Sequence, residues 1–295
     1  MSCNLSEYFD ERPDPSLRDH GMQLERREVM SANEFTQTYI KTNKPVIVTD
    51  GMRNWRAASL WTPDYFRTTL GSCEVQLYDN AFNFIGLSCL SDYITEYFGQ
   101  NSPLNPSSIP YVRAYCQFRN VEFLWADKLF SQLQNDWELP YFLPKSDYLL
   151  PYQMSEKIQP NQQAFPAKGL FISAKGCATH FHIDPWCSDA VLCQIHGEKE
   201  VTLFSPEQLP STLIDMNHLN ENELRPYLAR AYRGLLKPGE ILYIPNGWTH
   251  YVASRSDSIS LTWNFVHTTT GDAFLKYLSQ NLSAFDQSVM AYFYP

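Results

Sequence analysis

Positive charge and long apolar segments are both scarce in this sequence of 295 residues. Lys and Arg number 23 against 32 Asp and Glu, which gives a net charge of −9. Broad binding to a phosphate backbone needs clustered Lys and Arg, so we do not expect a nucleic-acid partner. No run approaches the roughly 20 apolar residues that a membrane-spanning helix requires, so we expect no membrane partner. An acidic surface would suit a basic protein or peptide, although most acidic proteins are simply soluble.

Cysteine motifs are also missing. The seven cysteines are odd in number and scattered, and no C-x-x-C pair occurs. This argues against a disulfide framework or a structural zinc knuckle and favours a reducing compartment. The N-terminal stretch MSCNLSEYFDERPDP contains no apolar segment like that of a signal peptide. We therefore expect an intracellular protein, in the cytoplasm or in the nucleus.

Apolar residues make up 44% of the chain, which is enough for a sizeable core. In residues 1–135, a capping box at Ser31–Glu34 and an N-cap at Thr62 before Pro63 predict helices, with short strands between them. We expect this half to be largely helical and packed on a barrel. Residues 139–168 are rich in Pro, Tyr and Gln without a clear period, which predicts a long ordered loop.

The pattern changes at residue 169, where short β-rich segments alternate with turn signals such as Pro238-Gly239 and Asn246-Gly247. Regularly spaced strands joined by hairpin turns predict a double-stranded β-helix, that is, a jelly-roll or cupin barrel, over residues 169–267. A helical insert is expected near 220–231, and apolar spacing predicts a closing helix in 270–295. The fold class is therefore mainly β with flanking helices, in one domain that spans 1–295.

The segment THFHIDP places His180, His182 and Asp184 at alternate positions. In a strand these three side chains share one face, whereas Phe181 and Ile183 point into hydrophobic packing. His250 follows 68 residues after His182, and a barrel can bring two such strands together. Two histidines and one carboxylate suit a non-haem Fe(II) site, although zinc is chemically possible. A simpler interpretation is that these polar groups only line a barrel mouth.

The segments HIDPWCSDAVLCQIHGEKEVTLFSP, KPGEILYIPNGWTHYVAS and ISLTWNF resemble the JmjC-domain, or cupin-like, Fe(II)- and 2-oxoglutarate-dependent oxygenases. The nearest branch is that of the lysyl hydroxylases and small protein hydroxylases. The resemblance covers residues 169–267 and extends to 29–71. It implies that His182, Asp184 and His250 are the iron ligands, and that no further catalytic residue is needed. His180 and His182 would instead form the ligand pair of an H-x-H cupin, but that motif also wants a Glu, which DPWCS lacks.

The resemblance also implies a set of residues that bind 2-oxoglutarate. Lys199 matches the lysine that pairs with the distal carboxylate, and Tyr111, with Tyr115 as a competitor, matches the phenol that helps it. Thr179, Thr262 and Asn264 match further positions that contact this cosubstrate.

The implied activity is hydroxylation of a C–H bond on a protein or peptide side chain, with Fe(II), 2-oxoglutarate and O2 as cofactors. The alternatives are a hydroxylase of small molecules or natural products, a JmjC-type demethylase of N-methyl-lysine, and a catalytically silent binding module. The C-terminal helix could pair with its copy or cover the barrel, so both a monomer and a homodimer are consistent with the sequence.

Overall fold

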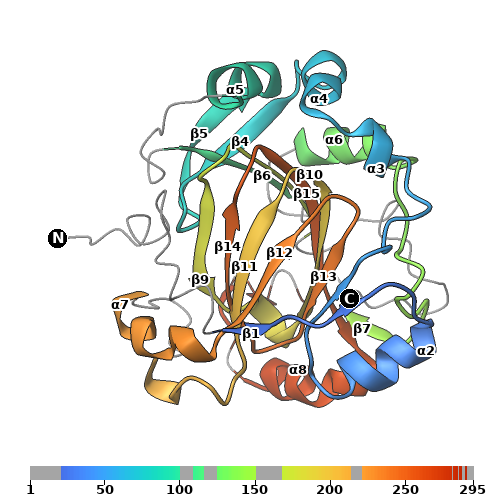
Figure 1. Ribbon diagram of the computed structural model, residues 1–295, viewed down its shortest axis with the longest axis vertical. Helices are drawn as coiled ribbons and strands as arrows, with labels where there is room; N and C mark the ends of the chain where they lie inside the picture. Colours follow the sequence, from blue (N-terminus) through green and yellow to red (C-terminus); the bar gives the residue numbers. More distant parts are fainter. Residues whose placement is uncertain are drawn as a thin grey trace.

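The computed structural model describes residues 21–99, 109–115, 125–150, 168–213, 221–280, 282–284, 286–287 and 290. Two β-sheets lie against each other, and helices surround them (Figure 1). The smaller sheet has the order β1 (Met22–Gln23), β12 (Tyr232–Leu236), β11 (Lys199–Phe204), β14 (Thr249–Ser254) and β9 (Ala178–His182).

The larger sheet has ten strands, and β7 pairs with β15 outside its main path. Its order is β2 (Arg26–Arg27), β3 (Val46–Val48), β13 (Ile241–Ile244), β10 (Asp189–His196), β15 (Ser258–His267), β8 (Gly169–Ser173), β6 (Tyr111–Tyr115), β4 (Glu74–Tyr78) and β5 (Phe84–Cys89), with β7 at Tyr148–Leu150. From β8 to β15, successive strands switch between the two sheets except for the pair β11 and β12, as in a jelly roll. The predicted fold class is confirmed.

Helices gather at the ends and sides of the sheets (Figure 1). They are α2 (Ala32–Phe35), α3 (Ala57–Leu60), α4 (Pro63–Thr69), α5 (Leu90–Tyr97), α6 (Trp125–Leu133), α7 (Glu221–Leu224) and α8 (Gly271–Leu278). A π-helical turn, η2 (Thr36–Ile40), continues α2, and short 3-10 helices lie at η4 (Pro185–Cys187), η5 (Ser211–Leu213), η6 (Arg225–Arg230) and η7 (Thr268–Thr270).

Two helix starts were predicted correctly from their capping residues. The Glu34 backbone N–H donates to Ser31 Oγ over 3.1 Å, and the Tyr65 backbone N–H donates to Thr62 Oγ1 over 3.2 Å. Each hydroxyl satisfies a backbone donor that has no partner within the first turn of its helix.

The described part of residues 1–135, for which we expected mainly helices with short strands between them, contains both kinds of element. Strands β3, β4, β5 and β6 alternate with the helices and extend the larger sheet. The largest apolar cluster fills the space between this half and the sheet, where Trp137 packs on Trp55 and on Trp263 of β15. The N-terminal half therefore completes one wall of the barrel as well as covering it.

Three further expectations concern loops and the C-terminal end. The insert predicted at 220–231 contains α7 and η6. Within 139–168, the structure describes a strand, β7, while residues 151–167 lie outside the described residues. Helix α8 packs on the barrel through Phe274, which is buried with Leu150 and Val266. No helix among the described residues is long and apolar enough to cross a membrane.

Candidate active site

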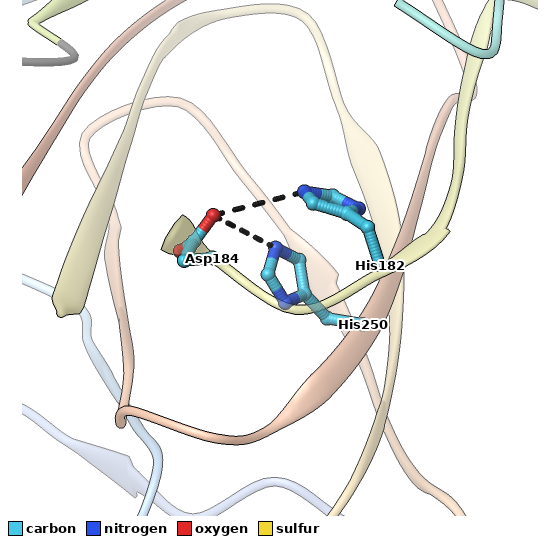
Figure 2. A group of neighbouring side chains, drawn as sticks. All are labelled: His182, Asp184 and His250. Atoms are coloured by element: carbon cyan, nitrogen blue, oxygen red, sulfur yellow. Dashed lines mark ion pairs between the residues drawn. The ribbon is translucent and has the colours of Figure 1, made fainter. Parts of the chain in front are cut away.

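Three side chains converge where strand β9 ends and strand β14 begins. His182 and His250 are direct partners in the β9–β14 ladder, and Asp184 lies just beyond the end of β9. Asp184 Oδ1 lies 3.7 Å from His182 Nε2 and 3.9 Å from His250 Nε2 (Figure 2). All three potential ligand atoms lie within 4.8 Å of one another. These separations suit three donors on one face of a metal ion.

Backbone carbonyl groups fix the orientation of both imidazole rings. His182 Nδ1 donates to the His180 carbonyl oxygen over 2.8 Å, and His250 Nδ1 donates to the Trp248 carbonyl oxygen over 3.1 Å. Because a carbonyl can only accept, each Nδ1 carries a proton, so Nε2 is the ring atom that can offer a lone pair to a metal ion. Burial and the neighbouring His250 also hold the pKa of His182 well below its usual range. His182 therefore already has the neutral imidazole that a metal ion requires.

Burial raises the pKa of Asp184, and the charge of His250 and a hydrogen bond with Asn264 oppose that effect. Asn264 donates from Nδ2 to Ser188 Oγ over 3.0 Å, which fixes the amide beside the carboxylate. A bound cation would favour the ionised form of Asp184 further.

Because of a β-bulge, the side chains of THFHIDP do not alternate as predicted. The register between β9 and β14 shifts by one residue between Thr179 and His182, which pair with Val252 and His250 respectively. Thr179 and His182 therefore both line the cavity although they are three residues apart, and His180 is exposed outside the triad. A bulge of this kind changes the alternation of side chains along a strand. Phe181 is buried in apolar packing as expected, but Ile183 lines the cavity.

The opposite end of the site contains a buried cation. Lys199, at the start of β11, has 0% of its surface exposed, and its Nζ donates to Tyr111 Oη over 2.8 Å. Lys199 has no carboxylate within ion-pair distance among the described residues. Gly197 sets this position through the tight turn before β11: its φ is +72°, and a Cβ there would lie 2.0 Å from the Asp257 carbonyl oxygen.

Of the two tyrosines proposed for the cosubstrate, Tyr111 contacts Lys199, and Tyr115 lines the same cavity four residues further along β6. Burial raises the pKa of Tyr115 beyond the usual range for a phenol. The hydrogen bond from Lys199 therefore favours Tyr111 as the phenol next to a bound carboxylate.

The remaining predicted residues also face this space. Thr262 and Asn264 lie two apart on β15 and point to one side, as expected for a strand. Thr262 Oγ1 donates to the Val191 carbonyl oxygen over 2.9 Å, and Thr179 Oγ1 accepts from Arg113 over 3.1 Å.

A cavity of about 410 Å³ between the two sheets joins all eight predicted site residues. Side chains from β9, β11 and β14 form one wall, and side chains from β6, β8, β10, β13 and β15 form the other. Much of the rest of the lining is aromatic or aliphatic: Phe82, Phe171, Trp186, Ala190, Leu192, Ile244 and Val252. The side chains of His182 and Asp184 keep 23% and 17% exposure, so the metal end of the cavity opens to solvent.

Sequence reasoning missed two residues beside the site. Phe82, in the turn between β4 and β5, lies with its ring centroid 5.1 Å from that of His182 and has a left-handed φ of +65°. Arg113 is fully buried two residues after Tyr111. No motif marks either residue, because only the pairing of β6 with β4 and β8 brings them to the site.

Comparison with known proteins identifies the family to which this architecture belongs. Residues 32–271 match the family model described as the cupin-like domain. The chain belongs to the cupin-like family. Within it, this chain is similar to JmjC domain-containing protein A of Dictyostelium discoideum, with 27% identity over 81% of the chain and 95% of that protein.

Two further relatives of this cupin-like chain have names that describe different activities. It is 24% identical to the arginine-specific demethylase JMJ20 of Arabidopsis thaliana, over 83% of the chain and 57% of that protein. It is 23% identical to the human tRNA wybutosine-synthesizing protein 5, over 83% of the chain and 78% of that protein. The chain thus spans little more than half of the plant relative.

The residues present fit the cofactors of the JmjC/cupin-like oxygenases, which are Fe(II), 2-oxoglutarate and O2. Two imidazoles and one carboxylate form a donor set suited to Fe(II) with open coordination positions. A buried lysine without an acidic partner among the described residues suits one carboxylate of a dicarboxylic acid. This cupin-like chain is therefore a 2-oxoglutarate-dependent iron oxygenase.

Proposed function

We propose that this chain hydroxylates a C–H bond on a side chain of a protein or peptide. The observation that carries the proposal is one cavity with His182, Asp184 and His250 at its open end and the Lys199–Tyr111 pair at its buried end. His182, Asp184 and His250 would hold Fe(II), which together with 2-oxoglutarate and O2 would supply the oxidising chemistry: one oxygen atom for the C–H bond, and the other for the succinate that forms as CO2 is lost. The chain's own residues hold these components and exclude water.

Each site residue has a separate role in this proposal. His182 and His250 offer their Nε2 atoms as ligands, and Asp184 supplies the negative charge. Lys199 and Tyr111 hold the distal carboxylate of 2-oxoglutarate in a position without water, where a charge-assisted hydrogen bond is strong. Thr179, Thr262 and Asn264 complete the binding site for the cosubstrate. None of these residues has to act as a general acid or base.

The substrate assignment rests on access and charge. The metal end of the cavity is open to solvent, and Phe82 at its edge is 37% exposed. A single side chain that projects from a larger molecule can enter such an opening. The net charge of −9 favours a basic protein or peptide over a polyanion such as RNA.

Demethylation is a second candidate, because a relative is named an arginine-specific demethylase. The same oxygen insertion at an N-methyl group gives an unstable product that releases formaldehyde. Both outcomes need the same residues around the metal, and only the position of the oxidised carbon distinguishes them.

The decisive experiment is to load the protein with Fe(II) under anaerobic conditions and then add 2-oxoglutarate, O2 and a pool of peptides from a cellular digest. We expect succinate to form faster with the pool, and one peptide to gain the mass of one oxygen atom. Loss of a methylene group together with formaldehyde release would support demethylation instead. A parallel reaction with bulk tRNA tests the remaining class, and modification of RNA but not peptide would contradict the proposal.

A matched variant, His180→Ala, should keep the triad intact because His180 lies outside it and the backbone carbonyl that accepts from His182 is retained. This variant should support the same succinate formation as the wild type. Asp184→Ala should form none above background.

A further inference from the structure

Arg113 is a second buried cation beside the cavity, and none of the roles described so far includes it. It lies on β6 with 0% of its surface exposed, two residues after Tyr111 and on the same side of the strand. Its guanidinium carbon lies 4.4 Å from the ring centroid of Tyr111 and 4.1 Å from that of Phe82. Arg113 forms no ion pair within 4.0 Å among the described residues, and burial of such an arginine costs free energy, so its contacts need an explanation.

The polar contacts of Arg113 connect two parts of the site. Nη1 donates to the Asp79 carbonyl oxygen over 2.7 Å, in the turn that carries Phe82. Nη2 donates to Thr179 Oγ1 over 3.1 Å. Nε has no acceptor in the part of the chain that the structure describes. The guanidinium therefore lies directly behind a hydroxyl that faces the cavity.

A threonine hydroxyl has one proton to donate and lone pairs to accept. Because Arg113 donates to a lone pair of Thr179 Oγ1, the hydroxyl proton of Thr179 remains available for another acceptor. The same logic applies to Tyr111, whose oxygen accepts from Lys199 and whose proton is then available. Thr262 differs, since its proton already goes to the Val191 carbonyl.

We propose that Arg113 is a positioning residue that turns Thr179 into a hydrogen-bond donor for a carboxylate of 2-oxoglutarate. Two cation–hydroxyl pairs, Lys199 with Tyr111 and Arg113 with Thr179, thus present two O–H groups to one dianion. The buried positive charge of Arg113 polarises the Thr179 hydroxyl and so strengthens it as a donor. This inference rests on the proposed function, because it requires 2-oxoglutarate as the ligand.

A purely structural role for Arg113 would be to anchor the β4–β5 turn through Asp79. The two roles differ in their dependence on Thr179. If Arg113 acts through the Thr179 hydroxyl, its effect on cosubstrate binding disappears once that hydroxyl is absent. If it only anchors the turn, its effect persists in the absence of Thr179.

The test is a double-mutant cycle on 2-oxoglutarate binding, measured by calorimetry with Mn(II)-loaded protein, which binds without turnover. We expect Arg113→Gln to weaken binding by about tenfold, the loss of one charge-assisted contribution. In combination with Thr179→Val, the Arg113→Gln change should have an effect of less than about twofold. Combined with Thr262→Val as the matched control, the two effects should multiply, because Thr262 does not contact Arg113.

Thermal unfolding of each variant shows whether it is folded. If Arg113→Gln does not fold, the same cycle uses Arg113→Lys, which keeps a cation but has one nitrogen for two acceptors and should give a smaller loss that Thr179→Val again removes. Equal losses from the Arg113 substitution with and without Thr179→Val would overturn the inference. Absence of 2-oxoglutarate binding by the Mn(II)-loaded wild type would overturn the proposed function instead.

Discussion

The two ends of the cavity differ in their contact with solvent. At the metal end, His182 and Asp184 keep 23% and 17% of their side-chain surface exposed. At the other end, Lys199 and Tyr111 are almost completely buried between the two sheets. One end can therefore exchange components with water, whereas the other is accessible only through the first.

This difference implies an order of binding. A small dicarboxylate has to pass the metal end to reach Lys199, and a bulky side chain that enters afterwards closes the way out. Under the proposed function, the exposed end would select the substrate and the buried end would select the cosubstrate. Variants at the two ends should therefore change different measurable quantities.

Asp184→Ala should have the largest effect, because it removes the only carboxylate from the triad. We expect bound iron and the 2-oxoglutarate-dependent visible absorption band to be lost, and succinate formation to fall to background. Metal analysis and anaerobic spectroscopy would measure these changes. An iron content equal to that of the wild type would contradict the assignment of Asp184 as a ligand.

Lys199→Met should separate cosubstrate binding from metal binding. We expect about 100-fold weaker binding of 2-oxoglutarate with unchanged iron content, because a charge-assisted pair in a buried site is lost. Without 2-oxoglutarate, the free energy of unfolding should rise by about 1–3 kcal/mol, since a buried cation is replaced by an apolar chain of similar length. Chemical denaturation would measure the second effect, and a loss of stability would show that Lys199 has an acidic partner in the protein.

Tyr111→Phe and Tyr115→Phe form a matched pair on one strand. Only the oxygen of Tyr111 contacts Lys199, so we expect about tenfold weaker 2-oxoglutarate binding for Tyr111→Phe and little change for Tyr115→Phe. Titration of both Mn(II)-loaded variants by calorimetry would measure the difference. The reverse result would assign the cosubstrate contact to Tyr115.

Asp189 offers a comparison with Lys199, because it is a buried charge outside the cavity. It accepts hydrogen bonds from the Asn246 backbone N–H over 2.9 Å and from Tyr243 Oη over 3.0 Å. Burial nevertheless raises the pKa of Asp189 to about 6. Between about pH 4 and pH 6, the folded protein therefore binds more protons at Asp189 than the unfolded chain does. As the pH rises through this range, deprotonation of Asp189 lowers the free energy of unfolding.

Asp189→Asn should remove this pH dependence. We expect the wild type to lose up to about 3 kcal/mol relative to the variant between roughly pH 4 and pH 6. Urea denaturation at several pH values would measure it, with metal-free protein so that proton-linked release of a metal does not contribute; protonation of the triad is common to both proteins and cancels in the comparison. Parallel curves for the two proteins would show that Asp189 titrates normally.

The elements that could be predicted best are those whose structure depends on residues close together in the sequence. The caps at Ser31 and Thr62 act within one turn of chain, and the hairpin turns of residues 169–267 act over a few residues. Strand β5, in contrast, was missed. Its residues Phe84, Ile85 and Leu87 are exposed, so its alternation of buried and exposed positions is weak.

The site was predicted through the resemblance, whereas its supporting contacts were not. The spacing of His182, Asp184 and His250 lies in the sequence, but the bulge that excludes His180 depends on pairing with β14. Arg113 looks like an ordinary strand arginine in YVRAY, and only the packing of β6 shows that it is buried. Contacts between distant strands have no local pattern, so a single sequence cannot predict them.

The metal-binding histidines owe their orientation to the carbonyl groups of His180 and Trp248. Every amino acid carries a backbone carbonyl, so substitution of either side chain leaves the acceptor in place. The arrangement is therefore robust to mutation in a way that an imidazole held by an aspartate would not be. Such a site allows the surrounding pocket to change over evolutionary time, and to adopt new substrates, without loss of the metal-binding geometry.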